Sequence, residues 1–197
     1  MIELPPGTRG LVFDCDGTLV DSMPLHTRLW NDCLAPYGVE LPQGYIDRHA
    51  GKPTEVIVEL INEQYRVAIN PPTLHEEKER LYRARIEEVG PIEPVVATAR
   101  RWRGELPMAV VSGGCRENVE LSLRANGMQD WFPVILTADD PIAPKPAPDL
   151  FLAAAEQLGL PPEACHAFED ADAGIAAARA AGMTVCDVRE LNLQVGD

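Results

Sequence analysis

Short apolar runs that alternate with helical patterns constrain the fold of this chain more than any other feature. The first run, residues 10–13, leads directly into Asp14, as a buried parallel strand does when it delivers polar groups at its carboxyl end. The four later runs are residues 107–112, 134–137, 164–168 and 183–188. The helical patterns between them are residues 95–102, 116–126, 148–158 and 173–181. Strands that alternate with helices predict an α/β fold with a doubly wound, Rossmann-like parallel sheet.

Residues 23–93 break this alternation. They contain three amphipathic helical patterns and no strand pattern: residues 24–37, 54–65 and 73–89. We therefore predict an α/β core domain formed by residues 1–22 and 94–197. The prediction places a small α-helical cap domain, residues 23–93, as an insertion after the first strand.

Charge and cysteine content exclude several classes of protein. The chain has 31 acidic and 17 basic residues and a formal net charge of −14, so its surface repels nucleic acid and we expect no such partner. We see no secretory signal and no run of the roughly 18 apolar residues that a membrane span needs. The five cysteines form no CxxC pair, which argues against a zinc site or a disulfide framework. We expect a cytoplasmic protein that is a monomer or a weak dimer.

Polar residues suited to catalysis follow the ends of the predicted strands. They are Asp14 and Asp16 after the first strand, Ser112 at the end of the second, Lys145 between two prolines, and Glu169 and Asp170 after the fourth strand. In open parallel sheets the ligand binds beyond the carboxyl ends of the strands. We therefore expect these residues to converge, although they are far apart in the sequence.

Each of these features also has an ordinary structural explanation. Residues 14–18 have the composition of a turn, Ser112 could belong to a plain strand-to-helix loop, and Lys145 could be a surface lysine. Together, however, they make a chemically complete set. Clustered carboxylates repel each other unless a hard cation is bound, and an oxygen-only cluster suits Mg²⁺. A lysine, a hydroxyl and loop amides would stabilise the oxygens of a phosphoryl group during its transfer.

Four motifs in this order resemble the haloacid dehalogenase superfamily, specifically its phosphatase and phosphomutase branch. Residues 14–18, Asp-Cys-Asp-Gly-Thr, resemble its DxDGT motif, and Ser112 resembles its second motif. Residues 145–149 are similar to the KPxPD form of the third motif, and residues 168–174 to FEDxxxG. The helical insertion is similar to the cap of the β-phosphoglucomutase-like subgroup. Residues 168–183 resemble bacterial phosphatases that act on fructose 1-phosphate and other sugar phosphates.

The resemblance implies a role for each core residue. Asp14 is implied as the nucleophile that becomes an aspartyl phosphate, and Asp16 as the general acid and base. Mg²⁺ is implied to bind the Asp14 carboxylate, the Asp16 backbone carbonyl and Asp170, with Glu169 inside or just outside the coordination sphere. Phosphate binding is implied for Ser112, Gly113 and Lys145.

The resemblance also implies substrate contacts from the cap. His26 follows Asp16 by ten residues, where the subgroup has a histidine near the hinge, and Lys78 precedes Tyr82 by four residues, as a substrate-contacting lysine does. Gly51 and Lys52 occupy the place of a cap loop that contacts substrate. The ordinary alternative for Lys78 is a solvated helix face.

Other functions remain open at this point. A phosphomutase of the β-phosphoglucomutase type would use the same core residues, but it needs a cap arginine where this chain has Thr54. A receiver-like signalling module also combines Asp, Ser or Thr, and Lys on a parallel sheet, but lacks the helical insertion and the second aspartate. A catalytically inactive binding protein is a third alternative, although every motif position is intact. We expect the substrate to be a small phosphorylated metabolite, and within that class a sugar phosphate.

Overall fold

The computed structural model describes residues 2–42, 44–49 and 54–191 and contains a parallel sheet of five strands in the order β3-β2-β1-β4-β5. The strands are β1 Gly10–Phe13, β2 Met108–Val111, β3 Val134–Leu136, β4 Cys165–Glu169 and β5 Thr184–Asp187. Every neighbouring pair is parallel, and β1 in the middle pairs with both β2 and β4. The predicted doubly wound α/β fold is confirmed.

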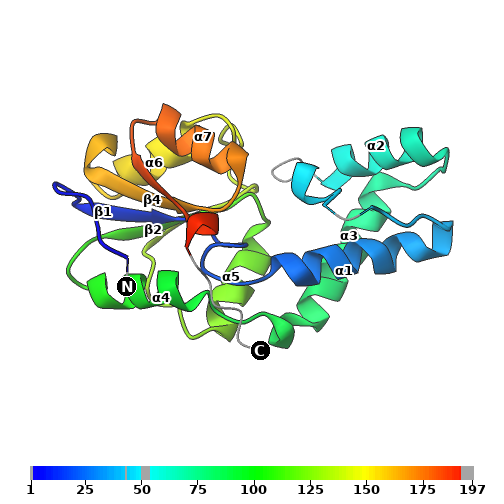
Figure 1. Cartoon of the computed structure of the whole chain (residues 1–197), viewed down its shortest axis with the longest axis horizontal. Coiled ribbons are helices and arrows are strands. Elements are labelled where there is room, and N and C mark those ends of the chain that lie inside the picture. Colours follow the sequence, from blue (N-terminus) through cyan, green and yellow to red (C-terminus); the bar gives the residue numbers. More distant parts are fainter. Residues whose placement is uncertain (1, 43, 50–53, 192–197) are drawn as a thin grey trace.

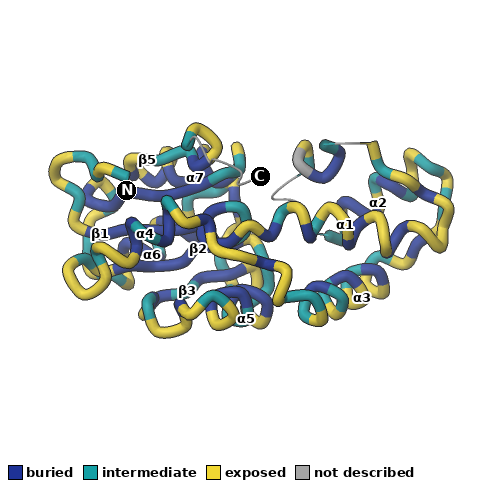
Figure 2. The backbone as a smooth tube through the Cα atoms, turned by 60° about the horizontal axis from the view of Figure 1, so that its bottom comes forward, coloured by how far each residue is buried: buried dark blue, intermediate teal, exposed yellow. Residues whose placement is uncertain are grey.

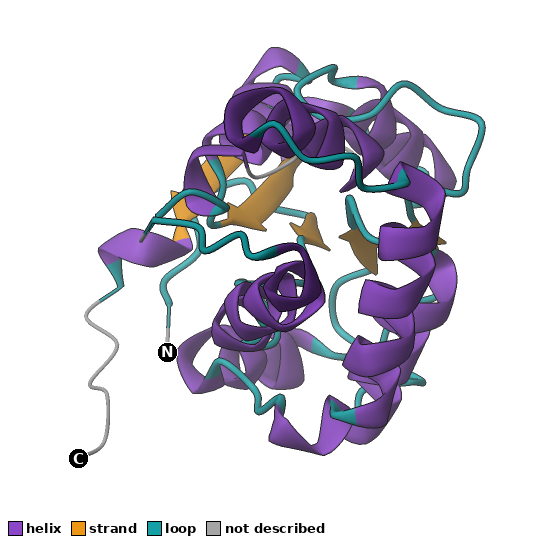
Figure 3. Ribbon diagram, turned by 90° about the vertical axis from the view of Figure 1, so that its right-hand side faces the viewer, coloured by secondary structure: helices purple, strands orange, loops and turns teal. Residues whose placement is uncertain are grey.

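Helices cover both faces of this sheet. The helices α4 Glu93–Trp102 and α5 Arg116–Ala125 cover one face, and α6 Asp149–Gln157 and α7 Asp172–Ala180 cover the other (Figure 1). Figure 3 shows the strands in the middle with helices on both sides.

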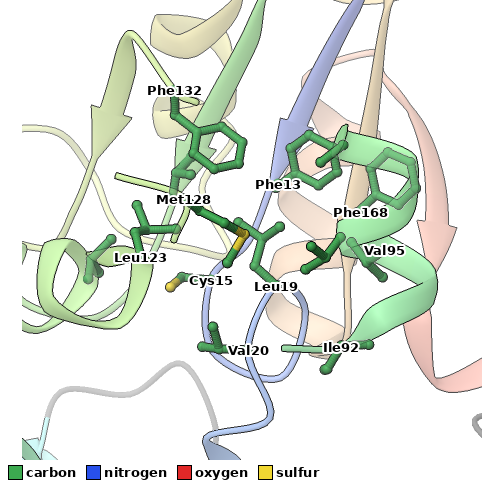
Figure 4. Packing of buried hydrophobic residues seen from close by; sticks show 14 of the residues in the cluster. Phe13, Cys15, Leu19, Val20, Ile92, Val95, Leu123, Met128, Phe132 and Phe168 are labelled. Atoms are coloured by element: carbon green, nitrogen blue, oxygen red, sulfur yellow. The ribbon is translucent and has the colours of Figure 1, made fainter. Parts of the chain in front are cut away.

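The central strand explains why both layers are apolar. Side chains alternate along a strand, so Leu11 and Phe13 pack with α4 and α5 while Val12 packs with α6 and α7. On the first side, Phe13 stacks on Phe168 with ring centroids 4.7 Å apart and meets Phe132 edge to face (Figure 4). A strand buried on both faces must read as a continuous apolar run, which is how residues 10–13 read.

Three further helices stand at the carboxyl end of the sheet. They are α1 Met23–Leu34, α2 Thr54–Tyr65 and α3 Pro71–Ala84 (Figure 1). They enclose their own apolar cluster, which includes Trp30, Val58, Ile61 and Leu74. Figure 2 shows buried and exposed residues alternating along each of them, as on an amphipathic helix, whereas β1 and β2 are buried throughout. The domain boundaries at residues 22/23 and 93/94 stay a prediction.

Helix α3 differs from its predicted bounds of residues 73–89. It begins at Pro71, because the Asn70 side chain accepts a hydrogen bond from the Thr73 amide and caps the helix, and a proline is well tolerated in the first turn. It ends at Ala84 and is followed by the short 3-10 helix Ile86–Glu88. The other 3-10 helices are Ala35–Tyr37, Asp47–His49, Pro162–Ala164 and Val188–Glu190.

Among the residues that the structure describes, no helix is both long and apolar enough to cross a membrane.

Candidate active site

A cavity of about 350 Å³ lies between the carboxyl ends of the strands and helices α1, α2 and α3. The predicted site residues that line it are Asp14, Asp16, His26, Lys78, Ser112, Gly113, Lys145, Glu169 and Asp170. The structure therefore brings together the core residues and two of the cap residues that the sequence singled out. Gly51 and Lys52 lie outside the described residues.

Lys145 is buried at the bottom of this cavity, not exposed as an isolated loop lysine would be. Its Nζ lies 2.7 Å from Asp14 Oδ1, contacts Glu169 Oε1 and donates a 3.0 Å hydrogen bond to the Val111 carbonyl. Burial alone would lower the pKa of Lys145, but the charges of Asp14 and Glu169 outweigh it and raise this pKa above its ordinary value. The ammonium form of Lys145 is therefore favoured between the two carboxylates.

Three carboxylates converge beside this lysine. Asp14, Glu169 and Asp170 each offer an oxygen, and these oxygens lie within 4.8 Å of one another. Burial raises the pKa of Asp14 well above its ordinary value, and Glu169 and Asp170 raise it further while Lys145 opposes them. Burial, followed by the charge of Glu169, also raises the pKa of Asp170, to about 6. A single lysine does not compensate three acids, and their oxygen-only donor set fits a hard divalent cation.

Two glycines allow the acids to approach so closely. Gly17 has a φ of +82°, and a side chain there would collide with the Asp170 carboxylate. A side chain at Gly174 would collide with Glu169. Glu169 is in turn held by the amides of Asp170 and Ala171, each 3.1 Å from Glu169 Oε2. The glycines of the first and fourth motifs are thus explained by the space that the acids occupy.

Asp16 lies in a different environment from Asp14. Its Oδ1 accepts a 2.6 Å hydrogen bond from Ser22 Oγ and lies 3.5 Å from both His26 Nε2 and the Tyr82 hydroxyl. Burial alone would raise the pKa of Asp16, but its contacts with His26 and Ser22 hold this pKa below its ordinary value. The two aspartates of the first motif therefore lie in environments that shift their pKa values in opposite directions.

The loop after β2 lines the cavity with Ser112, Gly113 and Gly114. Ser112 Oγ accepts a 3.0 Å hydrogen bond from the Gly114 amide, and the Cα of Gly113 faces open space. This loop leads into the N-terminus of α5, where backbone amides and the helix dipole favour a negative group.

Lys78 lies in the cavity wall and is 6% exposed, which excludes the solvated helix face. Its Nζ lies 2.7 Å from Glu79 Oε1. Whether Lys78 and His26 contact substrate stays a prediction.

Sequence reasoning missed several residues around Asp16. Ser22 bonds to it directly, and Tyr82 stacks on His26 with ring centroids 4.6 Å apart while its hydroxyl lies 2.9 Å from Ser122 Oγ. The sequence contains one weak indication that Tyr82 belongs to the site, namely its position four residues after Lys78. It contains no indication for Ser22, because nothing distinguishes this serine from an ordinary residue before a helix.

The chain is similar in sequence and in structure to known proteins. The family model described as haloacid dehalogenase-like hydrolase matches residues 11–188. The chain is similar to fructose-1-phosphate phosphatase YqaB of Escherichia coli K12, at 39% identity over 183 residues that cover 92% of this chain and 97% of that protein. It is 27% identical over 177 residues to the phosphorylated carbohydrates phosphatase of Thermotoga maritima, covering 88% and 81% of the two chains. Among solved structures, a haloacid dehalogenase-like protein of Agrobacterium tumefaciens is similar, with a TM-score of 0.77, 30% identity, and coverage of 91% and 82%.

Proposed function

This chain belongs to the haloacid dehalogenase-like hydrolase family, and from that premise we propose that it is a Mg²⁺-dependent phosphatase of small sugar phosphates that works through an aspartyl phosphate on Asp14. Its phosphatase activity is supported by relatives that are named as phosphatases. The observation that carries the proposal is the buried cluster of Asp14, Lys145, Glu169 and Asp170 at the carboxyl edge of the sheet.

The residues that would hold the metal ion are Asp14, Asp170 and Glu169, together with the backbone carbonyl of Asp16. Bound there, Mg²⁺ would neutralise phosphate charge, so that an anionic carboxylate can approach an anionic substrate. A cation at this position also favours the carboxylate form of Asp14, which opposes the effect of burial on its pKa.

The chemistry itself falls to the two aspartates. A carboxylate oxygen of Asp14 attacks the phosphorus, and the bond between phosphorus and the ester oxygen breaks. Asp16 in its protonated form gives its proton to the departing sugar oxygen. Asp16, now a carboxylate, takes a proton from the water that attacks the aspartyl phosphate, which releases phosphate and restores Asp14. The contacts of Asp16 with Ser22 and His26 support this second, basic role, because they favour its carboxylate form.

Phosphate would be held by Ser112, Gly113 and Lys145. The Lys145 ammonium is already placed beside the Asp14 oxygen, where negative charge develops on the transferring group.

A cavity of about 350 Å³ matches a small metabolite rather than a macromolecule. The substrate class rests on two relatives, which are named as phosphatases of fructose 1-phosphate and of phosphorylated carbohydrates.

The test is a phosphate-release assay with Mg²⁺ on a panel of phosphorylated sugars, polyols and nucleotides. We expect the highest kcat/KM on hexose or pentose monophosphates. A preference for nucleotides over every sugar phosphate would contradict the substrate class, and an aspartyl phosphate that forms but does not turn over would favour a signalling role.

The same assay separates a phosphatase from a phosphomutase. With β-glucose 1-phosphate and catalytic glucose 1,6-bisphosphate, we expect free phosphate and little glucose 6-phosphate. Isomerisation faster than phosphate release would make the mutase the better assignment. That the protein acts in the cytoplasm, as a monomer or a weak dimer, stays a prediction.

A further inference from the structure

One face of α3 lines the cavity along its length. His75, Lys78, Glu79 and Tyr82 have the i, i+3, i+4, i+7 spacing of a single helix face, and all four line the cavity. The Tyr82 hydroxyl lies 3.5 Å from Asp16 Oδ1, which marks the catalytic end. At a rise of 1.5 Å per residue, Lys78 is about 6 Å and His75 about 10 Å farther along the helix axis. The side chains from Lys78 to His75 therefore mark the distal end of the cavity, where the part of a substrate remote from its reacting phosphate would lie.

The distal end is acidic. Glu79 Oε1 lies 2.7 Å from Lys78 Nζ, so the two charges compensate each other and Lys78 is already engaged. Glu55, at the start of α2, has its Oε1 3.3 Å from His75 Nδ1. Among the described residues that line the whole cavity there are seven carboxylates, two lysines and no arginine. The other lysine, Lys145, is bound to the carboxylates at the catalytic end.

Glu79 is fixed in this position by the core domain. Its Oε2 accepts a hydrogen bond from the Asn118 side-chain NH2 group, and Oδ1 of the same Asn118 side chain accepts one of 3.3 Å from Arg83 Nη1. The Glu79 side chain is only 12% exposed, and Asn118 is buried. Glu79 therefore cannot turn toward solvent without breaking a contact between α3 and α5.

We propose that Glu79, together with Glu55, is a specificity determinant that restricts this enzyme to monophosphates with an uncharged, hydroxyl-rich distal part. Sugar hydroxyls can donate hydrogen bonds to the Glu79 and Glu55 carboxylates. A second phosphate would have to compete with Glu79 for Lys78 and would be repelled by Glu55, so bisphosphates are rejected. This inference rests on the proposed function and deepens it.

The test compares two substrates that differ only at the distal end, fructose 1-phosphate and fructose 1,6-bisphosphate. In the wild type we expect kcat/KM for release of the 1-phosphate to be at least about tenfold higher for the monophosphate, because like charges in one pocket are costly. Glu79→Gln keeps the size of the side chain, removes its charge and frees Lys78. It should lower this preference about tenfold, mainly through a lower KM for the bisphosphate.

Glu77→Gln is the matched control. Glu77 lies on the same helix and is paired with Arg80, but it is half-exposed and does not line the cavity. Its removal should leave the substrate preference unchanged. If Glu79→Gln does not fold, Glu55→Gln replaces it, and a smaller shift in the same direction is expected because Glu55 is more exposed than Glu79.

The outcomes are distinguishable. Equal kcat/KM for the two substrates in the wild type would overturn this inference and leave the proposed phosphatase function intact. Absence of phosphate release from fructose 1-phosphate and from every other sugar phosphate would instead contradict the proposed function. A Glu79→Gln variant that loses activity equally on both substrates would show a merely structural role for Glu79 and also overturn the inference.

Discussion

The ammonium of Lys145 lies 2.7 Å from the carboxylate of Asp14, although 131 positions separate the two residues in the chain. Both are buried, and Lys145 also contacts Glu169, which is fully buried. The lysine therefore supports the folded site before any substrate arrives, in addition to its proposed contact with the phosphate.

Replacing Lys145 with methionine should reduce both activity and stability. We expect kcat to fall at least about 100-fold, as when a donor to a developing charge is removed. Without metal, the buried carboxylates lose their partner, and breaking a buried ion pair in this way costs about 3–5 kcal/mol. In chelator, the thermal unfolding midpoint of the variant should be lower than that of the wild type. Adding Mg²⁺ should raise the midpoint of the variant more than it raises the midpoint of the wild type. An unchanged midpoint in chelator would contradict the structural role of the pair.

Asp14→Asn should abolish turnover while the protein still folds. The amide is a poor nucleophile, and loss of a covalent nucleophile costs about 10³-fold or more in kcat. The measurement is hydrolysis of p-nitrophenyl phosphate, with circular dichroism as the control for folding. A rate above about a tenth of wild type would rule out Asp14 as the nucleophile.

Asp16→Asn should have an effect that depends on the leaving group. The departing oxygen of fructose 1-phosphate needs a proton, whereas p-nitrophenolate needs little help. The loss in kcat/KM should therefore be about tenfold or more larger for the sugar phosphate. Equal losses on the two substrates would argue against Asp16 as the acid.

Removing the metal ion should abolish activity, and calcium should inhibit. The cluster of Asp14, Glu169 and Asp170 needs a cation, and Mg²⁺ enforces octahedral geometry. Calcium accepts more oxygen ligands and looser geometry, so it can engage both oxygens of Asp14 and leave none to attack. The measurement is phosphate release after exhaustive chelation, followed by addition of Mg²⁺ or Ca²⁺. Full activity in chelator would refute the metal requirement.

His166 should make the fold sensitive to acid. It is 4% exposed on β4, its Nδ1 lies 2.7 Å from Thr184 Oγ1, and burial lowers its pKa to about 4. An unfolded histidine takes up a proton near pH 6.5, so between about pH 6.5 and 4 the unfolded state binds more protons than the folded state. Its contribution to stability is therefore fully present above about pH 6.5 and is lost as the pH falls toward 4.

The effect of His166 is isolated by comparison with His166→Gln. Urea unfolding at pH 7.5 and at pH 5 should show that the wild type loses more free energy of unfolding between the two pH values than the variant. Since the acidic residues titrate in both proteins, only this difference reports on His166. Equal losses in the two proteins would show that His166 is not kept neutral by the fold.

Much of the core could be predicted because its signals are local. An apolar run such as residues 10–13 indicates a strand that is buried on both faces. The polar residue that follows it indicates the carboxyl edge of the sheet. Because parallel strands end at one edge, Asp14, Ser112 and Glu169 had to come together wherever the helices packed. The glycines at positions 17 and 174 belonged to the motifs, but only the structure shows that they make room for the acids.

What the sequence by itself determined about this protein is the α/β alternation, the helical insertion and the set of residues at the strand ends. Only the tertiary structure decided that Lys145 is buried between two acids, that Ser22 and Tyr82 surround Asp16, and that Glu79 balances Lys78. Strand and helix patterns arise from neighbouring residues and can be recognised along the chain. Contacts between side chains of two packed elements depend on how α3 packs against α5 and the edge of the sheet. No local periodicity in the sequence predicts that packing.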